Sequence, residues 1–247
     1  MRKFLLLIFL STVGLQLVAQ TKDSVAAAPK SRAHLRLSLF THSQGQFQFG
    51  GRLVSTNPGM NFGLNYDRKT WGFMMFKAAD LKDSHTDFNF MLAAFNKNFK
   101  IGKKLTIMPA LGVLFEQSRT FADHGSDAAF ILISNYKLSK KFSLEYTTLF
   151  ANFLVTPEEK DWVNRLRLTY TKDHLDVIAS GWHNNNVFDE ASYITYSLGV
   201  FYSRMKISDH FLWQAGVTCL RMPYTSDEKV DPTTNGLYFT VALQFVN

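Results

Sequence analysis

Short segments in which apolar and polar side chains alternate recur along most of this chain. Residues 105–115 place apolar side chains at every second position, namely Leu105, Ile107, Pro109, Leu111, Val113 and Phe115. Residues 237–245 repeat the pattern with Leu237, Phe239, Val241, Leu243 and Phe245. Successive side chains of a β-strand point to opposite faces, so a period of two predicts strands with one apolar and one polar face. The pattern therefore favours an all-β fold.

The connections between these segments alternate in length. Short connections are expected near residues 67–70, 100–104, 139–141, 172–174 and 207–210. Longer connections are expected near residues 80–86, 118–127, 156–161, 184–190 and 224–235. Short turns at one rim and longer loops at the other are typical of transmembrane β-barrels, in which the short turns face the periplasm. The spacing thus predicts an up-and-down antiparallel barrel in a bacterial outer membrane.

Aromatic residues flank nearly every predicted short turn. Tryptophan and tyrosine favour the boundary between water and membrane, where they form girdles around such barrels. The residues expected in this aromatic girdle are Tyr66, Trp71, Phe99, Tyr136, Phe142, Tyr170, Tyr202, Phe211, Trp213 and Phe245.

The number of strands depends on the first part of the barrel. Residues 32–41 and 46–55 both look extended, and counting them separately would give an odd total. Both termini are expected on the periplasmic side, which requires an even number of strands. Two interpretations satisfy this: one strand kinked near Gly50 and Gly51, where glycine permits a bend, or one strand followed by a long first loop. We expect about twelve strands, with ten or fourteen as alternatives.

The N-terminus has the features of a secretory signal peptide. Arg2 and Lys3 precede an almost wholly apolar run over residues 4–18, which is shorter than the roughly 20 residues that a membrane-spanning helix needs. We expect cleavage after Ala19, a short periplasmic segment over residues 20–32, and a barrel over residues 33–247.

Charge and cysteine content narrow the functional classes. The formal net charge is +7, and the lysines lie in turns such as residues 97–104 and 137–141 rather than in one recognisable module. Nucleic-acid binding is therefore not expected. The chain has one cysteine, Cys219, so it can form neither an intrachain disulfide nor a cysteine-rich zinc site.

These features together resemble small outer-membrane barrel proteins of Gram-negative bacteria, particularly those of the Bacteroidota. The resemblance rests on the signal ending in Ala19 and Gln20, the lysine-bearing tight turns, and a last strand carrying Phe239, Leu243 and Phe245. It is architectural and covers the whole mature chain. One departure is the terminus, since such barrels often end on an aromatic residue. The resemblance implies contact with outer-membrane lipid and with the barrel-insertion machinery, and it allows protein partners in the envelope.

Candidate catalytic and metal-binding residues are few. His42 and Ser43 come nearest to the histidine and serine of outer-membrane phospholipases, but adjacent strand residues point to opposite faces and cannot share a hydrogen bond. His183 and the acidic segment 225–234 are interpreted as loop residues. We expect no catalytic residue, no metal and no cofactor.

The polar face of each strand is expected to line the barrel interior, because charges facing lipid are costly. The predicted lumen-lining residues are Arg52, Glu116, Glu145, Arg165, Arg167 and Asp176. Two states of the lumen stay open at this point, one plugged by pairs of arginine and carboxylate and one filled with water.

The functional expectation is a channel or transport component for small polar solutes. The alternative is a structural or accessory barrel in a larger envelope assembly. A lipid-modifying enzyme is disfavoured, because the catalytic spacing is missing.

Overall fold

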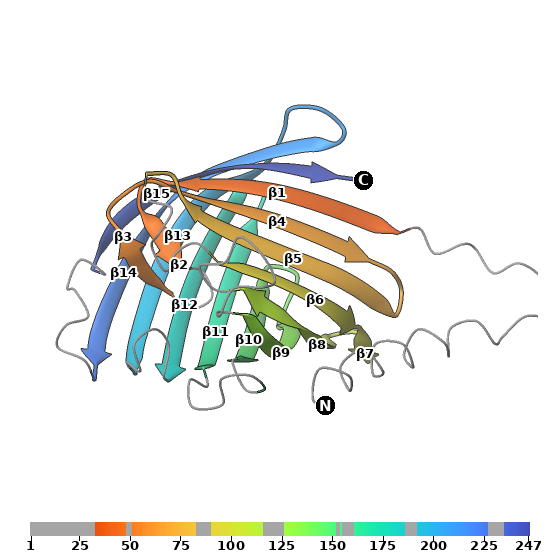
Figure 1. Ribbon diagram of the computed structural model, residues 1–247. Coiled ribbons are helices and arrows are strands. Elements are labelled where there is room, and N and C mark those ends of the chain that lie inside the picture. The colour runs from red at the N-terminus through yellow and green to blue at the C-terminus, as the bar shows by residue number, and fades with distance from the viewer. Residues whose placement is uncertain are drawn as a thin grey trace, which may run out of the picture. The chain divides into compact units, whose positions relative to one another are not determined.

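The computed structural model describes residues 33–47, 51–82, 90–115, 126–151, 154, 161–185, 192–226 and 235–247. All of them belong to the second of the two units into which the chain divides, Ala33–Asn247. They form antiparallel β-strands (Figure 1). These residues include no helix that is long and apolar enough to cross a membrane. The predicted signal peptide, its cleavage site and the segment 20–32 lie outside the described residues.

The strands of the barrel wall are joined in sequence order by turns and loops. Their bounds are β1 His34–His42, β4 Gly59–Asp67, β5 Trp71–Asp80, β6 Met91–Lys97, β7 Phe99–Ile101, β8 Leu105–Phe115, β9 Ser126–Lys137, β10 Phe142–Ala151, β11 Asp161–Lys172, β12 Leu175–Asn185, β13 Tyr193–Lys206, β14 Phe211–Thr225 and β15 Gly236–Val246.

The described strands close into a barrel with twelve wall strands. β6 and β7 both pair with β8 in one continuous register, so they are a single wall strand interrupted at Asn98. β1 pairs with both β4 and β15, which joins the two ends of the chain. The pairing of β6 with β8 completes the ring. The predicted all-β antiparallel barrel of about twelve strands is confirmed.

The alternation of short turns and long loops is also confirmed. Turns at residues 68–70, 102–104, 138–141, 173–174 and 207–210 connect strands at one rim, which we call the short-turn rim. The longer connections lie at the opposite rim, the long-loop rim. β1 begins and β15 ends at the short-turn rim, where the backbone N–H of Asn247 donates to the carbonyl of Leu35 at 3.1 Å.

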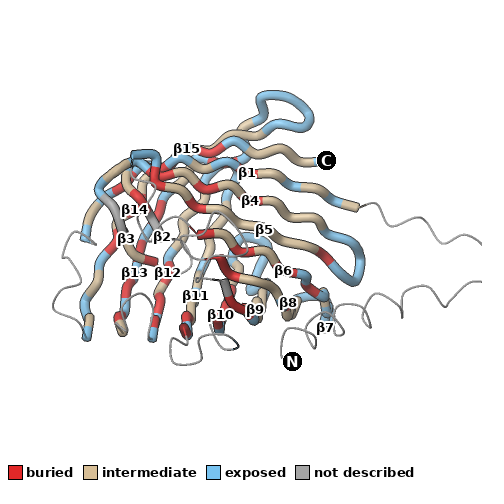
Figure 2. The backbone as a smooth tube through the Cα atoms, in the orientation of Figure 1, coloured by how far each residue is buried: buried red, intermediate tan, exposed pale blue. Residues whose placement is uncertain are grey.

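Burial alternates along the wall strands, as Figure 2 shows by colour. In β13, Tyr193, Thr195 and Ser197 are buried, whereas the intervening Ile194 and Tyr196 are exposed. The exposed side chains form the outer surface, which carries large apolar residues on most strands. The wall therefore presents an apolar exterior and a more polar interior, as period-two alternation requires.

The first long connection contains a hairpin that stands apart from the wall. β2 (Gly45–Phe47) and β3 (Arg52–Ser55) pair only with each other, in a separate two-stranded sheet between β1 and β4. Of the two interpretations of residues 33–55, the strand followed by a long first loop is correct. The even strand count follows, because the hairpin adds nothing to the wall.

The aromatic residues predicted to form a girdle lie on strand ends beside the short turns. Trp71, Phe99 and Tyr202 are among those exposed. Some of these rings also contact each other, such as Phe142 and Tyr170, whose planes are tilted by 44° and whose centroids lie 4.9 Å apart. Contact of these rings with lipid stays a prediction.

Candidate functional site: the barrel lumen

A cavity of about 280 Å³ lies inside the barrel. Its wall is formed by β1 and by the consecutive strands β11 to β15. Serine, threonine and glutamine side chains provide much of the lining, and Arg165, Arg167 and Asp176 provide the charges. The lumen is therefore the place where the fold gathers polar groups, and it is the candidate functional site.

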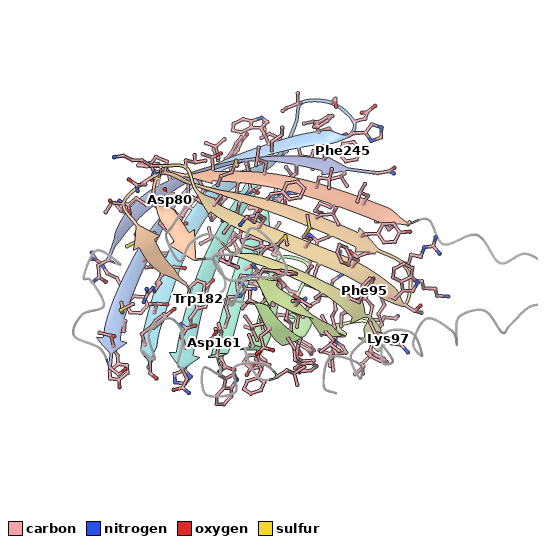
Figure 3. The ribbon with its side chains drawn as sticks, viewed as in Figure 1. Asp80, Phe95, Lys97, Asp161, Trp182 and Phe245 are labelled. Atoms are coloured by element: carbon pink, nitrogen blue, oxygen red, sulfur yellow. The ribbon has the colours of Figure 1, made fainter. Side chains whose placement is uncertain are left out.

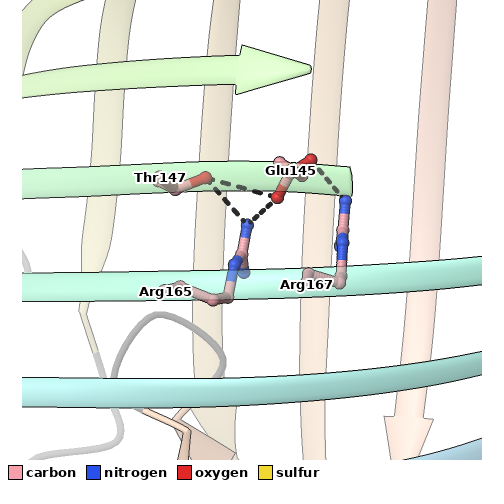
Figure 4. A network of polar contacts seen from close by, with 4 residues as sticks. All are labelled: Glu145, Thr147, Arg165 and Arg167. Carbon is pink, nitrogen blue, oxygen red and sulfur yellow. Dashed lines mark hydrogen bonds and ion pairs between the residues drawn. The ribbon is translucent and has the colours of Figure 1, made fainter. Parts of the chain in front are cut away.

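Two arginines of β11 share one carboxylate of β10 on the lumen face (Figure 4). Arg165 Nη2 donates to Glu145 Oε1 at 2.7 Å, and Arg167 Nη2 donates to Glu145 Oε2 at 2.5 Å. Strand pairing sets this geometry, because Glu145 lies opposite Arg167 and Thr147 lies opposite Arg165. Thr147 Oγ1 completes the network by donating to Glu145 Oε1 at 3.3 Å.

This network carries an excess of positive charge. Two guanidinium groups face one carboxylate, and both Arg165 and Arg167 line the cavity. The Nε–H of each arginine is buried without a hydrogen-bond partner in the structure. These two Nε atoms are closed off from solvent, so the cluster offers the cavity its positive charge rather than these donors.

Asp176, the other predicted lumen charge, is already paired. Arg204 Nη1 donates to its two carboxylate oxygens at 2.6 and 2.9 Å, and Thr171 Oγ1 donates at 2.7 Å. Arg204 lies where the register of β13 shifts against β14, with a φ of 59°. Sequence reasoning missed Arg204, because the alternation pattern does not reveal such an irregularity.

A row of polar side chains crosses β4, β1 and β15 on the lumen face. His42 Nδ1 hydrogen-bonds Thr240 Oγ1 at 2.8 Å, and His42 Nε2 hydrogen-bonds Asn61 Nδ2 at 2.9 Å. Ser43 is exposed, and its Oγ accepts from the backbone N–H of Phe239 at 3.0 Å. His42 and Ser43 thus bond to different partners, as expected for adjacent residues of an extended segment. Among the described residues, no group of three or more histidine, cysteine, aspartate or glutamate side chains is placed to hold a metal ion.

The hairpin of β2 and β3 reaches into the lumen. A β-carbon added to Gly51 would lie 2.1 Å from Cδ2 of Trp182, a buried residue of β12 labelled in Figure 3. Leu53 packs in a buried cluster with Leu220 of β14 and Tyr238 of β15. The hairpin therefore contacts several wall strands from the inside and fills part of the lumen.

The predicted residue Arg52 is carried by this hairpin. Its guanidinium carbon lies 5.4 Å from the ring centroid of Tyr193, a buried residue of β13. Arg52 is thus inside the barrel but does not belong to a wall strand. Glu145, Arg165, Arg167 and Asp176 lie on wall strands. Glu116 lies outside the described residues.

Part of the interior is apolar, which the sequence analysis did not anticipate. A buried cluster contains Leu92, Ile131 and Trp182 together with a row of alanines on neighbouring strands, Ala78, Ala94, Ala110, Ala129 and Ala151. Alanine alternates with large outward residues such as Phe95 and Phe130, and the small side chains leave room for the larger ones inside. The weak hydrophobicity of alanine hid this inward-facing row in the pattern.

Comparison with known proteins adds evidence on the fold. No family model matches the chain, and no curated protein matches it. The KdgM porin is a similar solved structure, with a TM-score of 0.56 and 9% identity over 85% of this chain and 98% of that chain.

Two further structures give the same result. The COG4313 outer membrane channel from Pseudomonas putida F1 has a TM-score of 0.53 and 8% identity over 92% of this chain and 100% of that chain. The NanC porin has a TM-score of 0.53 and 9% identity over 85% of this chain and 98% of that chain. The chain therefore has the β-barrel fold that is found in small outer-membrane channels.

Proposed function

We propose that this protein is an outer-membrane channel that passes small anionic solutes. The observation that carries the proposal is the cluster of Arg165, Arg167 and Glu145, which places two cations and one anion beside the lumen cavity. A lumen charge acts on a solute at short range and is only partly screened by salt, so its sign decides which ions concentrate there.

The outer surface supports a position in the membrane. Side chains such as Leu198, Leu237 and Phe239 are more than half exposed, on a strand face that carries few charges. A contiguous apolar surface of this kind is not stable in water, whereas a closed barrel satisfies its backbone hydrogen bonds within lipid. Outer-membrane lipid is the partner that fits this surface.

The arginines suit an anionic solute by geometry as well as by charge. Guanidinium groups bind carboxylates and phosphates through parallel hydrogen bonds. Glu145 holds Nη2 of each arginine, and both arginines line the cavity. The KdgM porin, which has a similar fold, has been solved with disordered oligogalacturonate, so this type of barrel accommodates an anionic chain.

The inserted hairpin limits the size of the solute. A solute crossing the barrel must pass between the hairpin and the wall, where Leu53 and Trp182 occupy the interior. We infer a narrow channel that is suited to small solutes.

Ion selectivity in planar bilayers tests this function. In a salt gradient, the reversal potential of the unmodified barrel should indicate preference for anions. Arg165→Glu with Arg167→Glu should shift it toward cations, because the cluster then carries net negative charge. The matched control is Lys82→Glu with Arg221→Glu, which makes the same change in charge at exposed positions away from the cavity.

The outcomes separate the alternatives. Equal shifts in both double variants would show that net charge, rather than the cluster, sets selectivity. A folded barrel without any conductance would overturn the channel and favour an accessory role in an envelope assembly, which stoichiometric co-purification of partner proteins would then identify.

A further inference from the structure

The two rims of the barrel differ strongly in charge. Cations occupy three of the five short turns, and strand ends supply the cations beside the other two. The basic residues of this rim are Arg68, Lys69, Lys97, Lys100, Lys103, Lys104, Lys137, Lys140, Lys141, Lys172, Arg204 and Lys206. The acids in the same segments are Asp67, Asp173, Asp176 and Asp209. At the long-loop rim, strand ends instead carry Asp80, Asp127 and Asp161. Figure 3 shows Lys97 at one end of the wall and Asp80 and Asp161 at the other.

The cations of the short-turn rim are exposed and largely uncompensated. All of these lysines are exposed. Within the described part of the chain, Arg204 is the one rim cation that takes part in an ion pair, with Asp176. The rim therefore presents a ring of positive charge that the barrel itself does not neutralise.

The best-defined part of the ring combines cations with outward-facing aromatic rings. The guanidinium carbon of Arg68 lies 5.5 Å from the ring centroid of Trp71, and Arg68 Nε donates to the hydroxyl of Tyr66 at 3.0 Å. Lys97 lies opposite Trp71 in the pairing of β5 with β6, and its Nζ lies 5.5 Å from the ring centroid of Phe99. Two cations thus flank one tryptophan at the edge of the apolar exterior.

We infer that the short-turn rim binds the headgroups of anionic phospholipids. The inference rests on the membrane position proposed above. Cations on juxtamembrane segments attract anionic lipid, and long basic side chains keep their charge at the interface while their stems lie along apolar surface. Tyrosine and tryptophan prefer the same depth.

The distribution of the cations favours a lipid surface over a protein partner. The basic residues lie in or beside every short turn and so are spread around most of the rim, directly beside the apolar exterior. A globular partner would contact one arc of this ring, whereas the leaflet encloses all of it. Glycerophospholipids with a net negative headgroup match both the charge and the position.

Lipid retention by the full barrel in detergent tests the inference. The folded barrel is mixed with equal amounts of phosphatidylglycerol and phosphatidylcholine that carry the same acyl chains, and the bound lipids are counted by native mass spectrometry. The unmodified barrel should retain mainly phosphatidylglycerol, with a preference that weakens as salt is added. Each cation near a lipid surface contributes roughly 5-fold in affinity, so Arg68→Gln with Lys97→Gln should reduce the preference for phosphatidylglycerol by about 25-fold.

A matched double variant and a conservative variant provide the controls. Lys82→Gln with Arg221→Gln removes two exposed cations that lie away from the short-turn rim. This variant should leave the preference for phosphatidylglycerol unchanged. Arg68→Lys keeps the charge and should retain most of the preference. Heat-modifiable migration in gels confirms that each variant is folded.

Three results would overturn the inference. They are equal retention of both lipids by the unmodified barrel, equal loss in both double variants, and unchanged preference in Arg68→Gln with Lys97→Gln. A co-purifying acidic protein in place of the lipid preference would point to a protein partner instead. Because lipid counting needs no conductance, a barrel that prefers phosphatidylglycerol but passes no ions would refute the channel and leave this inference intact.

Discussion

Gly51 of the inserted hairpin lies directly against the indole ring of Trp182 on wall strand β12. A β-carbon at residue 51 would approach Cδ2 of the ring to 2.1 Å, and Gly51 has a φ of 64°, in the region that favours glycine. The contact leaves no room for a side chain between hairpin and wall. It therefore locates the first loop of the chain inside the barrel.

Gly51→Ala should destabilise the hairpin in its inserted position. The substitution introduces a steric conflict with a buried ring, and alanine also pays a backbone cost at a positive φ. We therefore expect the free energy of unfolding, measured by chemical denaturation in lipid vesicles, to fall by about 2–4 kcal/mol. Gly102→Ala is the matched control, because Gly102 has a φ of 62° and nothing within 4 Å of its β-carbon position. It should cost about 1 kcal/mol. Equal losses for the two variants would mean that Trp182 does not confine the hairpin.

Removal of the hairpin should widen the channel. Replacement of residues 45–55 by a short glycine and serine linker would take Leu53 away from Leu220 and Tyr238 and open the interior. Single-channel conductance in planar bilayers should rise, while the preference for anions should persist because Arg165 and Arg167 stay in place. Unchanged conductance in a folded variant would show that the hairpin is not the constriction.

Glu145→Gln should weaken the lumen network and increase its positive charge. The carboxylate holds Arg165 and Arg167, and its loss leaves two like charges close together on a largely buried face. We expect the free energy of unfolding to fall by about 1–3 kcal/mol, which is below the usual figure for a buried pair because the three side chains keep some exposure to solvent. We also expect stronger anion selectivity. Thr147→Val removes a hydrogen-bond partner without changing charge, so it should cost about 1 kcal/mol and leave selectivity unchanged. Identical selectivity in the two variants would contradict this account.

His42→Ala should destabilise the closure of the barrel between its first and last strands. His42 bonds Thr240 on β15 and Asn61 on β4, and both partners are buried. Leaving them unsatisfied should cost about 1–3 kcal/mol in chemical denaturation. Ser43→Ala removes one exposed bond to the same strand and should cost about 1 kcal/mol or less. If His42→Ala costs less stability than Ser43→Ala, then the polar row of Asn61, His42 and Thr240 does not stabilise the pairing of β1 with β15.

The orientation of the barrel is open to a test on intact cells. An epitope inserted within residues 225–234, on the long-loop side, should be reached by antibody from outside. One inserted at Lys140, in a short turn, should be reached only after the cells are permeabilised. The reverse labelling would invert the topology and place the basic rim at the cell surface.

Local sequence was sufficient for the architecture of the wall. Alternation along segments such as residues 237–245 assigns each side chain to a face, because the direction of a strand side chain depends only on its position in the pleat. It placed Arg165 and Arg167 together on the face opposite Leu166 and Leu168, and the alternating connections led to twelve strands.

Partners and interior packing were decided by the tertiary structure. The choice of Glu145 as the partner of Arg167 depends on the register of β10 against β11, and the pairing of Arg204 with Asp176 depends on an irregularity in β13. The inward position of Arg52 and Leu53 required wall strands distant in sequence to supply a surface for them. Alternation along one strand carries no information about which residues of other strands lie opposite it, so these contacts exist only once the barrel has closed.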